Sequence, residues 1–120
     1  MTITFVNFAR VEDNADWAKI TKVWNEGGDS GAADPGCLSW TFNISEDKKT
    51  ISNRDCYKDL AAVVHRMKAT AHLVEILPEL GITYEKAFAY CTKDVDLDEL
   101  KKVLGAYADM TTFFVVEREE

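Results

Sequence analysis

The sequence has fewer basic than acidic residues and no long apolar run. It contains 14 lysines and arginines against 21 aspartates and glutamates, a formal net charge of −7. Nucleic acids and anionic membrane surfaces are bound through clustered basic side chains, so neither is expected as a partner. No apolar run approaches the roughly 18 residues of a membrane-spanning helix. The N-terminal residues also lack the basic and apolar segments of a signal peptide, and we therefore expect a cytoplasmic protein.

Cysteine and histidine are scarce, which argues against a metal or redox site. The three cysteines, Cys37, Cys56 and Cys91, are widely spaced and form no C-x-x-C pair. His65 and His72 are seven residues apart, roughly 10 Å along a helix, which is too far for both to bind one metal ion. Phosphate-binding loops, dinucleotide fingerprints and serine-hydrolase motifs are absent as well. We therefore predict no metal site and no cofactor.

The composition is that of one globular domain. The 120 residues are 47% hydrophobic and 29% charged. A chain of this size and composition can bury a core without disulfide or metal staples. We therefore expect a single domain over residues 1–120.

The spacing of the apolar residues predicts eight helices and strands. Alternation at period two predicts strands at 2–11, 37–44, 50–57, 82–91 and 111–116. Helical spacing predicts helices from Asn14 to Gly27, over 59–77, and from Asp94 or Asp96 to about Tyr107. The glycine-rich stretch 27–36 is expected to be a loop, either a plain connection or a lid over a site.

The resulting order, β-α-β-β-α-β-α-β, predicts an α+β fold. Its first six elements form a split β-α-β unit, in which an antiparallel, ferredoxin-like sheet carries its helices on one face. The other face of the sheet then needs a cover, and a second copy related by a two-fold axis is the simplest one. We therefore expect a homodimer that closes into a dimeric α+β barrel.

The two histidines and one asparagine are candidates for chemistry. His65 could be a general base, a substrate donor or an iron ligand, and His72 could bind substrate, although both could equally be surface residues. Asn7 lies among apolar neighbours in the first strand, where a polar side chain needs a partner. Asn7 could therefore orient a ligand in a cavity, or it could face solvent on the outer side of the sheet.

A second group of candidates lies on the strands that follow. The alternation places Asn53, Asp55 and Tyr57 on one face of the strand 50–57, where a substrate cavity or a solvated edge would explain their polarity. Trp40 is either a cavity wall or part of the core. A small aromatic or apolar molecule is the ligand that such a cavity would accept.

Two segments carry a family resemblance. The segment Asp34-Pro35-Gly36-Cys37-Leu38-Ser39-Trp40 resembles the E-P-G-C-L-x-Y/W pattern at the start of the second strand in antibiotic biosynthesis monooxygenase-like (ABM) proteins. The segment from Asp55 to His65 is similar to the E-x-Y-x-D-x-x-A-x-x-x-H signature of the same family, with Asp55 in place of the glutamate and His65 one residue earlier than the histidine of the signature. Asn7 resembles, by position, the first-strand asparagine of some oxygenase relatives. The resemblance covers most of the chain.

The resemblance implies a fold and a choice of functions. The fold is a ferredoxin-like domain whose sheets form a barrel across a dimer. The implied activity is that of a cofactor-independent monooxygenase acting on a quinol or polyketide-like aromatic, with His65 and Asn7 as catalytic residues. Two alternatives remain open, a non-enzymatic dimer that binds an unknown ligand and a protein that binds or degrades haem.

Overall fold

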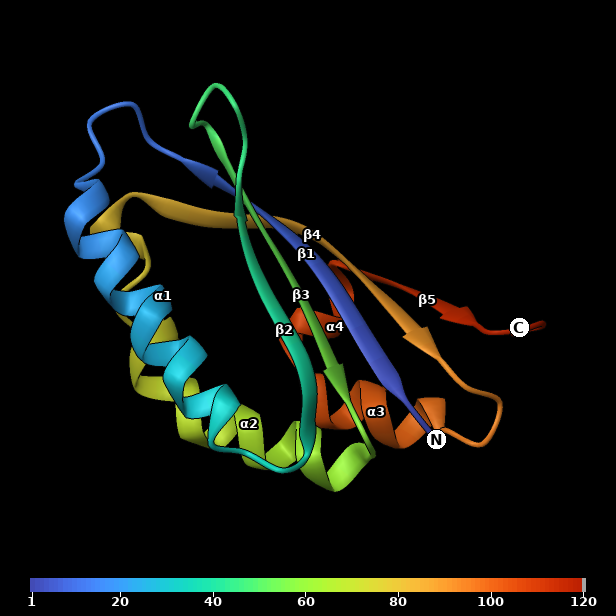
Figure 1. Ribbon diagram of the computed structural model, residues 1–120. Coiled ribbons are helices and arrows are strands. Elements are labelled where there is room, and N and C mark those ends of the chain that lie inside the picture. Colours follow the sequence, from blue (N-terminus) through green and yellow to red (C-terminus); the bar gives the residue numbers. More distant parts are fainter. Residues whose placement is uncertain (120) are drawn as a thin grey trace.

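Five strands form a single sheet, and the helices lie against one of its faces (Figure 1). The computed structural model describes residues 1–119. The strands are β1 (Ile3–Val11), β2 (Cys37–Ile44), β3 (Thr50–Tyr57), β4 (Ile82–Cys91) and β5 (Thr111–Val115). The helices are α1 (Trp17–Ala32), α2 (Leu60–Val74), α3 (Leu97–Leu104) and α4 (Ala106–Asp109), with a 3-10 turn, η1 (Pro78–Leu80).

The sheet has the strand order β2-β3-β1-β4-β5, with β1 at its centre. Strand β1 pairs antiparallel with both β3 and β4, and β2 pairs antiparallel with β3. These four strands are the split β-α-β unit predicted from the sequence. Strand β5 lies parallel to β4, because the chain crosses over through α3 and α4 before it returns to the sheet. The predicted α+β, ferredoxin-like fold is thereby confirmed.

Alternation along the strands divides the sheet into two different faces. In β1, Ile3, Phe5, Asn7, Ala9 and Val11 are buried against the helices, while the residues between them point the other way. The helix-covered side holds two hydrophobic clusters, one built around α3 and one around α1. The core therefore lies in a single layer between sheet and helices.

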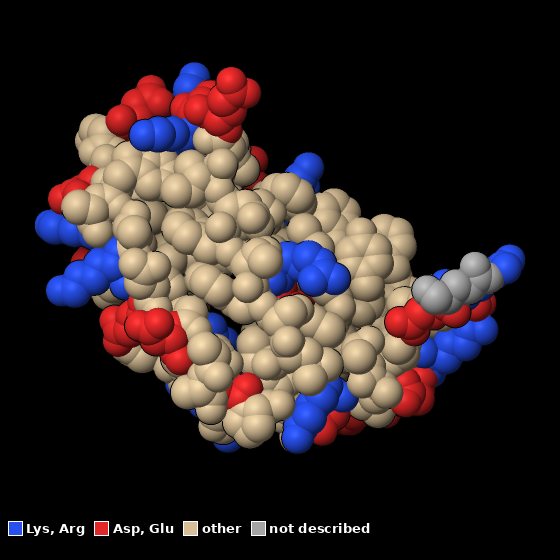
Figure 2. All heavy atoms as spheres, viewed as in Figure 1, with Lys and Arg blue, Asp and Glu red and all other residues tan. Residues whose placement is uncertain are grey.

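The opposite side of the sheet, called here the open face, has no described element packed over it. Five apolar side chains gather on its β1-β4-β5 half, namely Val6, Phe8, Phe88, Tyr90 and Phe114. In Figure 2, which has the viewpoint of Figure 1, charged side chains gather mainly around the rim of the molecule. No helix among residues 1–119 has the length and apolarity needed to cross a membrane.

Helix α1 corrects one prediction. The stretch 27–36 was predicted to be a loop, but α1 begins after Asp16, which caps it in place of Asn14, and continues to Ala32, so that only residues 33–36 connect it to β2. A Cβ atom added to Gly28 would lie 2.8 Å from the Trp40 ring, and one at Gly31 would lie 3.2 Å from the Arg66 side chain. The glycines therefore permit close packing, and that packing offsets their poor helix propensity.

Two other helix boundaries differ from the prediction. Helix α2 ends at Val74, and the residues before Gly81 form the separate turn η1 around Pro78. The third helix is broken at Gly105, whose φ of +59° interrupts the helical path and separates α3 from α4. This break turns the chain so that α4 reaches the edge of the core.

Candidate functional site

A cavity of about 500 Å³ lies between the helix-covered face of the sheet and helices α1, α2 and α4. Its walls are mostly apolar, with contributions from Phe5, Val63 and Leu77. Met67 and Val74 of α2 also line it and are exposed, so they mark its opening. Enclosure by apolar walls with a few polar groups is typical of sites for small molecules.

The polar floor of the cavity comes from the two central strands. Asn7 of β1 and Asn53 of β3 are paired in register, so both amides are on the helix-covered face. Asn53 is only 4% exposed, and its Oδ1 accepts a hydrogen bond of 3.0 Å from Trp24 Nε1. Oδ1 of Asn7 is buried and has no hydrogen-bond partner among the described residues. The Asn7 carbonyl is therefore free to accept a hydrogen bond from a ligand.

Asp55 is the titratable group of the floor. Its Oδ2 accepts a hydrogen bond of 3.1 Å from the Tyr57 hydroxyl, whereas Oδ1 is buried without a partner in the described chain. Burial raises the pKa of Asp55 to about 6, against the opposing effects of the Tyr57 hydrogen bond and the Arg66 charge. Burial, and then the Asp55 charge, raise the pKa of Tyr57 far above its usual value, so this phenol stays protonated.

Arg66 is a cavity residue that the sequence analysis missed. It projects from α2, is only 7% exposed, and donates a hydrogen bond of 2.6 Å from Nη2 to the carbonyl oxygen of Gly27 in α1. Nη1 is buried with no partner among residues 1–119. The available signal was its spacing of three and four residues from Val63 and Ala62, which places Arg66 on the buried stripe of the helix.

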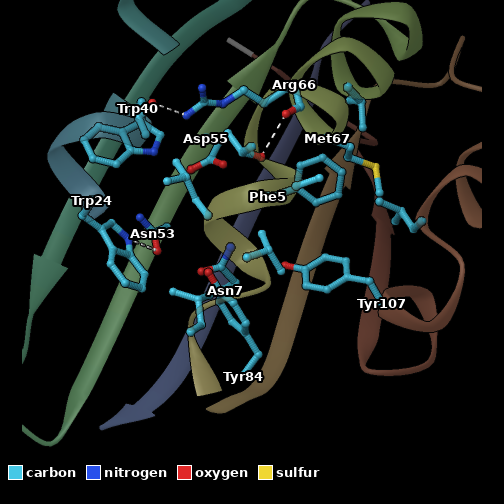
Figure 3. Close-up of a pocket in the computed structure, with 18 of the residues that line it drawn as sticks. Phe5, Asn7, Trp24, Trp40, Asn53, Asp55, Arg66, Met67, Tyr84 and Tyr107 are labelled. Atoms are coloured by element: carbon cyan, nitrogen blue, oxygen red, sulfur yellow. Dashed lines mark hydrogen bonds between the residues drawn. The ribbon is translucent and has the colours of Figure 1, made fainter. Parts of the chain in front are cut away.

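Tyr107 extends the polar lining from the other side of the cavity. It projects from α4, and Figure 3 shows its hydroxyl, with Asn7 and Asp55, directed toward the same space. Burial raises the pKa of Tyr107 to about 12, although the Asn7 amide lowers it. Tyr84 of β4 packs edge-on against Tyr107, with ring centroids 6.3 Å apart. The sequence analysis placed Tyr107 on a helix but not in the site.

The two histidines lie outside this cavity. His65 is 69% exposed on its side chain, and its Nδ1 lies 2.9 Å from Oδ2 of Asp34. His72 is also exposed, with Nε2 3.3 Å from Oε1 of Glu26. His65 precedes Arg66 by one residue, which turns its side chain about 100° away from the buried stripe. The catalytic role of His65 and the binding role of His72 remain predictions without support from the cavity.

The structure brings together all five of the other predicted site residues. Asn7, Trp40, Asn53, Asp55 and Tyr57 all line the cavity. No group of three or more histidine, cysteine, aspartate or glutamate side chains that could hold a metal ion occurs in the described part of the chain. The site can therefore offer a carboxylate, phenols, an amide and a guanidinium to a ligand.

Comparison with known proteins supports the fold. No family model matches the sequence, and no curated protein sequence matches it significantly. MupZ from Pseudomonas fluorescens superposes with a TM-score of 0.84 at 17% identity, covering 99% of this chain and 93% of MupZ. SnoaB, a cofactor-independent oxygenase from Streptomyces nogalater, gives 0.62 at 20% identity, covering 73% of this chain and 89% of SnoaB.

A candidate antibiotic biosynthesis monooxygenase from Deinococcus radiodurans is similar to the same degree. Its TM-score is 0.62 at 15% identity, with 75% of this chain and 90% of that chain covered. Identities this low establish a common architecture and leave the chemistry to be argued from the cavity. The chain thus has the ferredoxin-like α+β fold of the ABM-like proteins, as the resemblance of its motifs predicts.

Proposed function

We propose that the protein binds a small, largely apolar molecule in the cavity and removes a proton from it through Asp55, without a cofactor. The observation that supports this most is Asp55 itself, a carboxylate in an apolar cavity with one unpartnered oxygen and a pKa raised to about 6. A base with this pKa is largely ionised at neutral pH and still holds a proton well enough to be effective. Asn7 and Trp40 would orient the ligand beside it.

The reaction of this kind that the fold neighbours favour is oxygenation of an aromatic substrate. Removal of a proton from a quinol or polyketide-like aromatic gives an electron-rich anion that can react with O₂. In an anthrone-type substrate, one oxygen atom of O₂ then replaces the two hydrogens of the ring CH₂ to form a carbonyl, and the other oxygen atom leaves as water. The substrate supplies all the electrons, so no cofactor is needed. The apolar walls would exclude water from the anion.

Oxygen uptake with anthrone and a panel of quinols tests this function. Asp55→Asn should lower kcat/KM by at least about 100-fold, because general-base catalysis typically contributes that much. The kcat/KM of the wild type should fall below about pH 6, where Asp55 takes up a proton. Lys68→Met, an exposed change on α2, is the control and should leave the rate unchanged. Uptake that persists in Asp55→Asn would contradict the assignment of the base.

The two alternatives make different demands on the site. A protein that only binds its ligand would retain binding in this cavity and show no uptake with any substrate of the panel. Haem binding would require an axial ligand, and neither His65 nor His72 lines the cavity. A hemin titration that gives no Soret shift would remove the haem alternative.

The proposal includes a homodimer formed through the open face. Tyr90 and Phe114 stack there with centroids 5.0 Å apart, yet they are 41% and 42% exposed. Phe8 and Phe88 continue the aromatic strip with centroids 6.1 Å apart. A strip of this kind is larger than the isolated apolar side chains found on most monomer surfaces. A second copy of the same face would cover it.

A further inference from the structure

We infer that Arg66 binds an oxyanion of the ligand, so that the ligand class is a small apolar molecule with one acidic oxygen, such as a phenol, an enol or a carboxylic acid. This inference rests on the proposed function in that it uses the same cavity and places the ligand beside Asp55. It adds a specificity-determining residue and a charge requirement that proton removal alone does not impose.

The burial of Arg66 is the first argument. Every other lysine and arginine of the chain is exposed, so Arg66 is the one basic side chain that is buried. The protein as a whole carries a net charge of −7. Arg66 forms no ion pair with a carboxylate of the described residues, and its protein hydrogen bond goes to the neutral carbonyl of Gly27. A buried charge that forms no direct ion pair is disfavoured, even where a carboxylate such as Asp55 acts on it from a distance. An anionic ligand in the cavity would supply the counter-ion.

The second argument is that α1 makes room for the guanidinium. Side chains at Gly27 and Gly31 would approach Arg66, and a Cβ at Gly31 would lie 3.2 Å from Nη2 and 3.3 Å from Cζ. The two glycines are one helical turn apart, so together they form a shallow notch on the face of α1 that meets α2. The notch and the Gly27 carbonyl hold the guanidinium in place and leave Nη1 without a protein partner.

The third argument is that Arg66 and Asp55 each have a buried polar atom without a hydrogen-bond partner in the described chain. The charge of Arg66 reaches Asp55, yet the two form no ion pair, and each has an unpartnered buried atom, Nη1 in one and Oδ1 in the other. A ligand hydroxyl can satisfy both atoms, since it donates to a carboxylate oxygen and accepts from a guanidinium nitrogen. When Asp55 takes the proton, the remaining oxyanion keeps its hydrogen bond to Arg66, which becomes charge-assisted and stronger.

Binding of matched aromatic probes tests the inference without any turnover. Trp24 and Trp40 line the cavity, so quenching of their fluorescence can report the Kd values of 1-naphthoate and of its neutral isostere 1-naphthamide. Wild-type protein should bind 1-naphthoate at least tenfold more tightly. In Arg66→Met this preference should fall close to one, and Arg66→Lys should restore part of it. A titration with 1-naphthol extends the test to a phenol, and its affinity should fall in Arg66→Met as well.

The controls separate the role of Arg66 from folding and from the proposed reaction. Lys68→Met removes an exposed charge from the same helix and should keep the tenfold preference. Far-UV circular dichroism should show that Arg66→Met is folded, because apolar replacement of a buried charge is often neutral or stabilising. Asp55→Asn should keep or strengthen the preference for 1-naphthoate, since it removes a negative charge near the anion.

The possible outcomes are distinct. Equal binding of the two naphthyl probes by the wild type, a preference that survives Arg66→Met, or no binding of either probe would each overturn the inference. If Arg66→Met does not fold, a preference that is unchanged in Arg66→Lys would also overturn it, whereas a reduced preference there would support it. Loss of the preference in Arg66→Met together with full oxygen uptake by Asp55→Asn would refute the proposed base and leave the anion site intact.

Discussion

At the scale of single residues, the cavity disfavours the ionised form of the Asp55 side chain. Its pKa is raised from 3.8 to about 6 because burial removes water from the carboxylate. Between these two values the folded protein binds a proton that the unfolded chain does not. The free energy of unfolding should therefore decrease as the pH rises from about 4 to about 6, and stay level above that.

Asp55→Asn should remove this pH dependence. The shift of about two pH units corresponds to roughly 3 kcal/mol, at about 1.4 kcal/mol per unit. The variant should be more stable than the wild type by up to that amount at pH 7, and about equally stable below pH 4. Denaturant unfolding at a series of pH values measures the difference. The exposed Asp98→Asn is the control, and a parallel pH profile in Asp55→Asn and wild type would contradict the prediction.

The hydrogen bond between Trp24 and Asn53 leads to a second prediction at this scale. Asn53→Ala leaves the buried indole N–H without a partner, which should lower the free energy of unfolding by about 1–3 kcal/mol. In a Trp24→Phe background the same change should cost less, because no donor is left unpaired. A double-mutant cycle by urea unfolding measures the coupling, and additive effects would show that the bond contributes nothing.

Single residues were also where sequence reasoning was most uneven. The floor residues Asn7, Asn53 and Asp55 were candidates from the sequence, because polar side chains in these strands indicate either a cavity or a solvated position, and only the structure distinguishes the two. Arg66 could not be separated from its exposed neighbour His65 by residue type, since histidine is the usual sign of catalysis. The difference is one position on a helix, and it depends on the orientation of α2, which the packing of α1 determines.

At the scale of elements, α1 shows how packing overrides local propensity. The three glycines of this helix predict an end to it, but they are the residues through which it approaches β2 and α2. The strands were predictable because period-two alternation reports directly on burial. The extension of α1 was not, because the contacts that hold it come from residues far away in the chain.

Two neighbouring glycines of α1 should respond in opposite ways to alanine. Alanine at Gly27 would place its Cβ 3.7 Å from Leu73, an ordinary contact, and should stabilise the protein by up to about 1 kcal/mol through helix propensity. The Cβ of alanine at Gly28 would lie 2.8 Å from the Trp40 ring, so this substitution should destabilise the protein by about 1–3 kcal/mol. Thermal unfolding measures both, and equal stabilisation would show that Trp40 does not pack against α1.

At the scale of the whole molecule, the two faces of the sheet have separate tasks. The cavity is enclosed by the helices of the same chain, whereas in the proposed dimer the open face would place the aromatic strip against another copy. A stable interface needs about 800 Å² from each partner. Dimerisation and ligand binding should therefore be separable by mutation.

Light scattering coupled to size exclusion tests this separation. Wild-type protein should have twice the 13.5 kDa mass of the chain. Phe114→Asp should give a monomer that still binds 1-naphthoate, because a buried carboxylate would oppose association on the open face. Ile44 is also apolar and exposed, but it lies on the helix-covered side of β2, opposite the buried Ile51. The Ile44→Asp variant should therefore remain dimeric. A wild-type monomer at 100 μM would rule out the dimer.

The central position of β1 has a consequence for how the chain acquires its fold. The first strand to be synthesised pairs with the fourth, so that Ile3 lies opposite Cys91, and with the third, so that Ile3 also lies opposite Tyr57. While the chain is being made, one edge of β1 can pair fully only after residue 57 of β3 has been added, and its other edge only after residue 91 of β4 has been added. Contacts so distant in sequence slow folding and prolong exposure to aggregation. We therefore expect the yield of refolding to fall as the protein concentration rises, because the apolar β1 is exposed until its partners are in place.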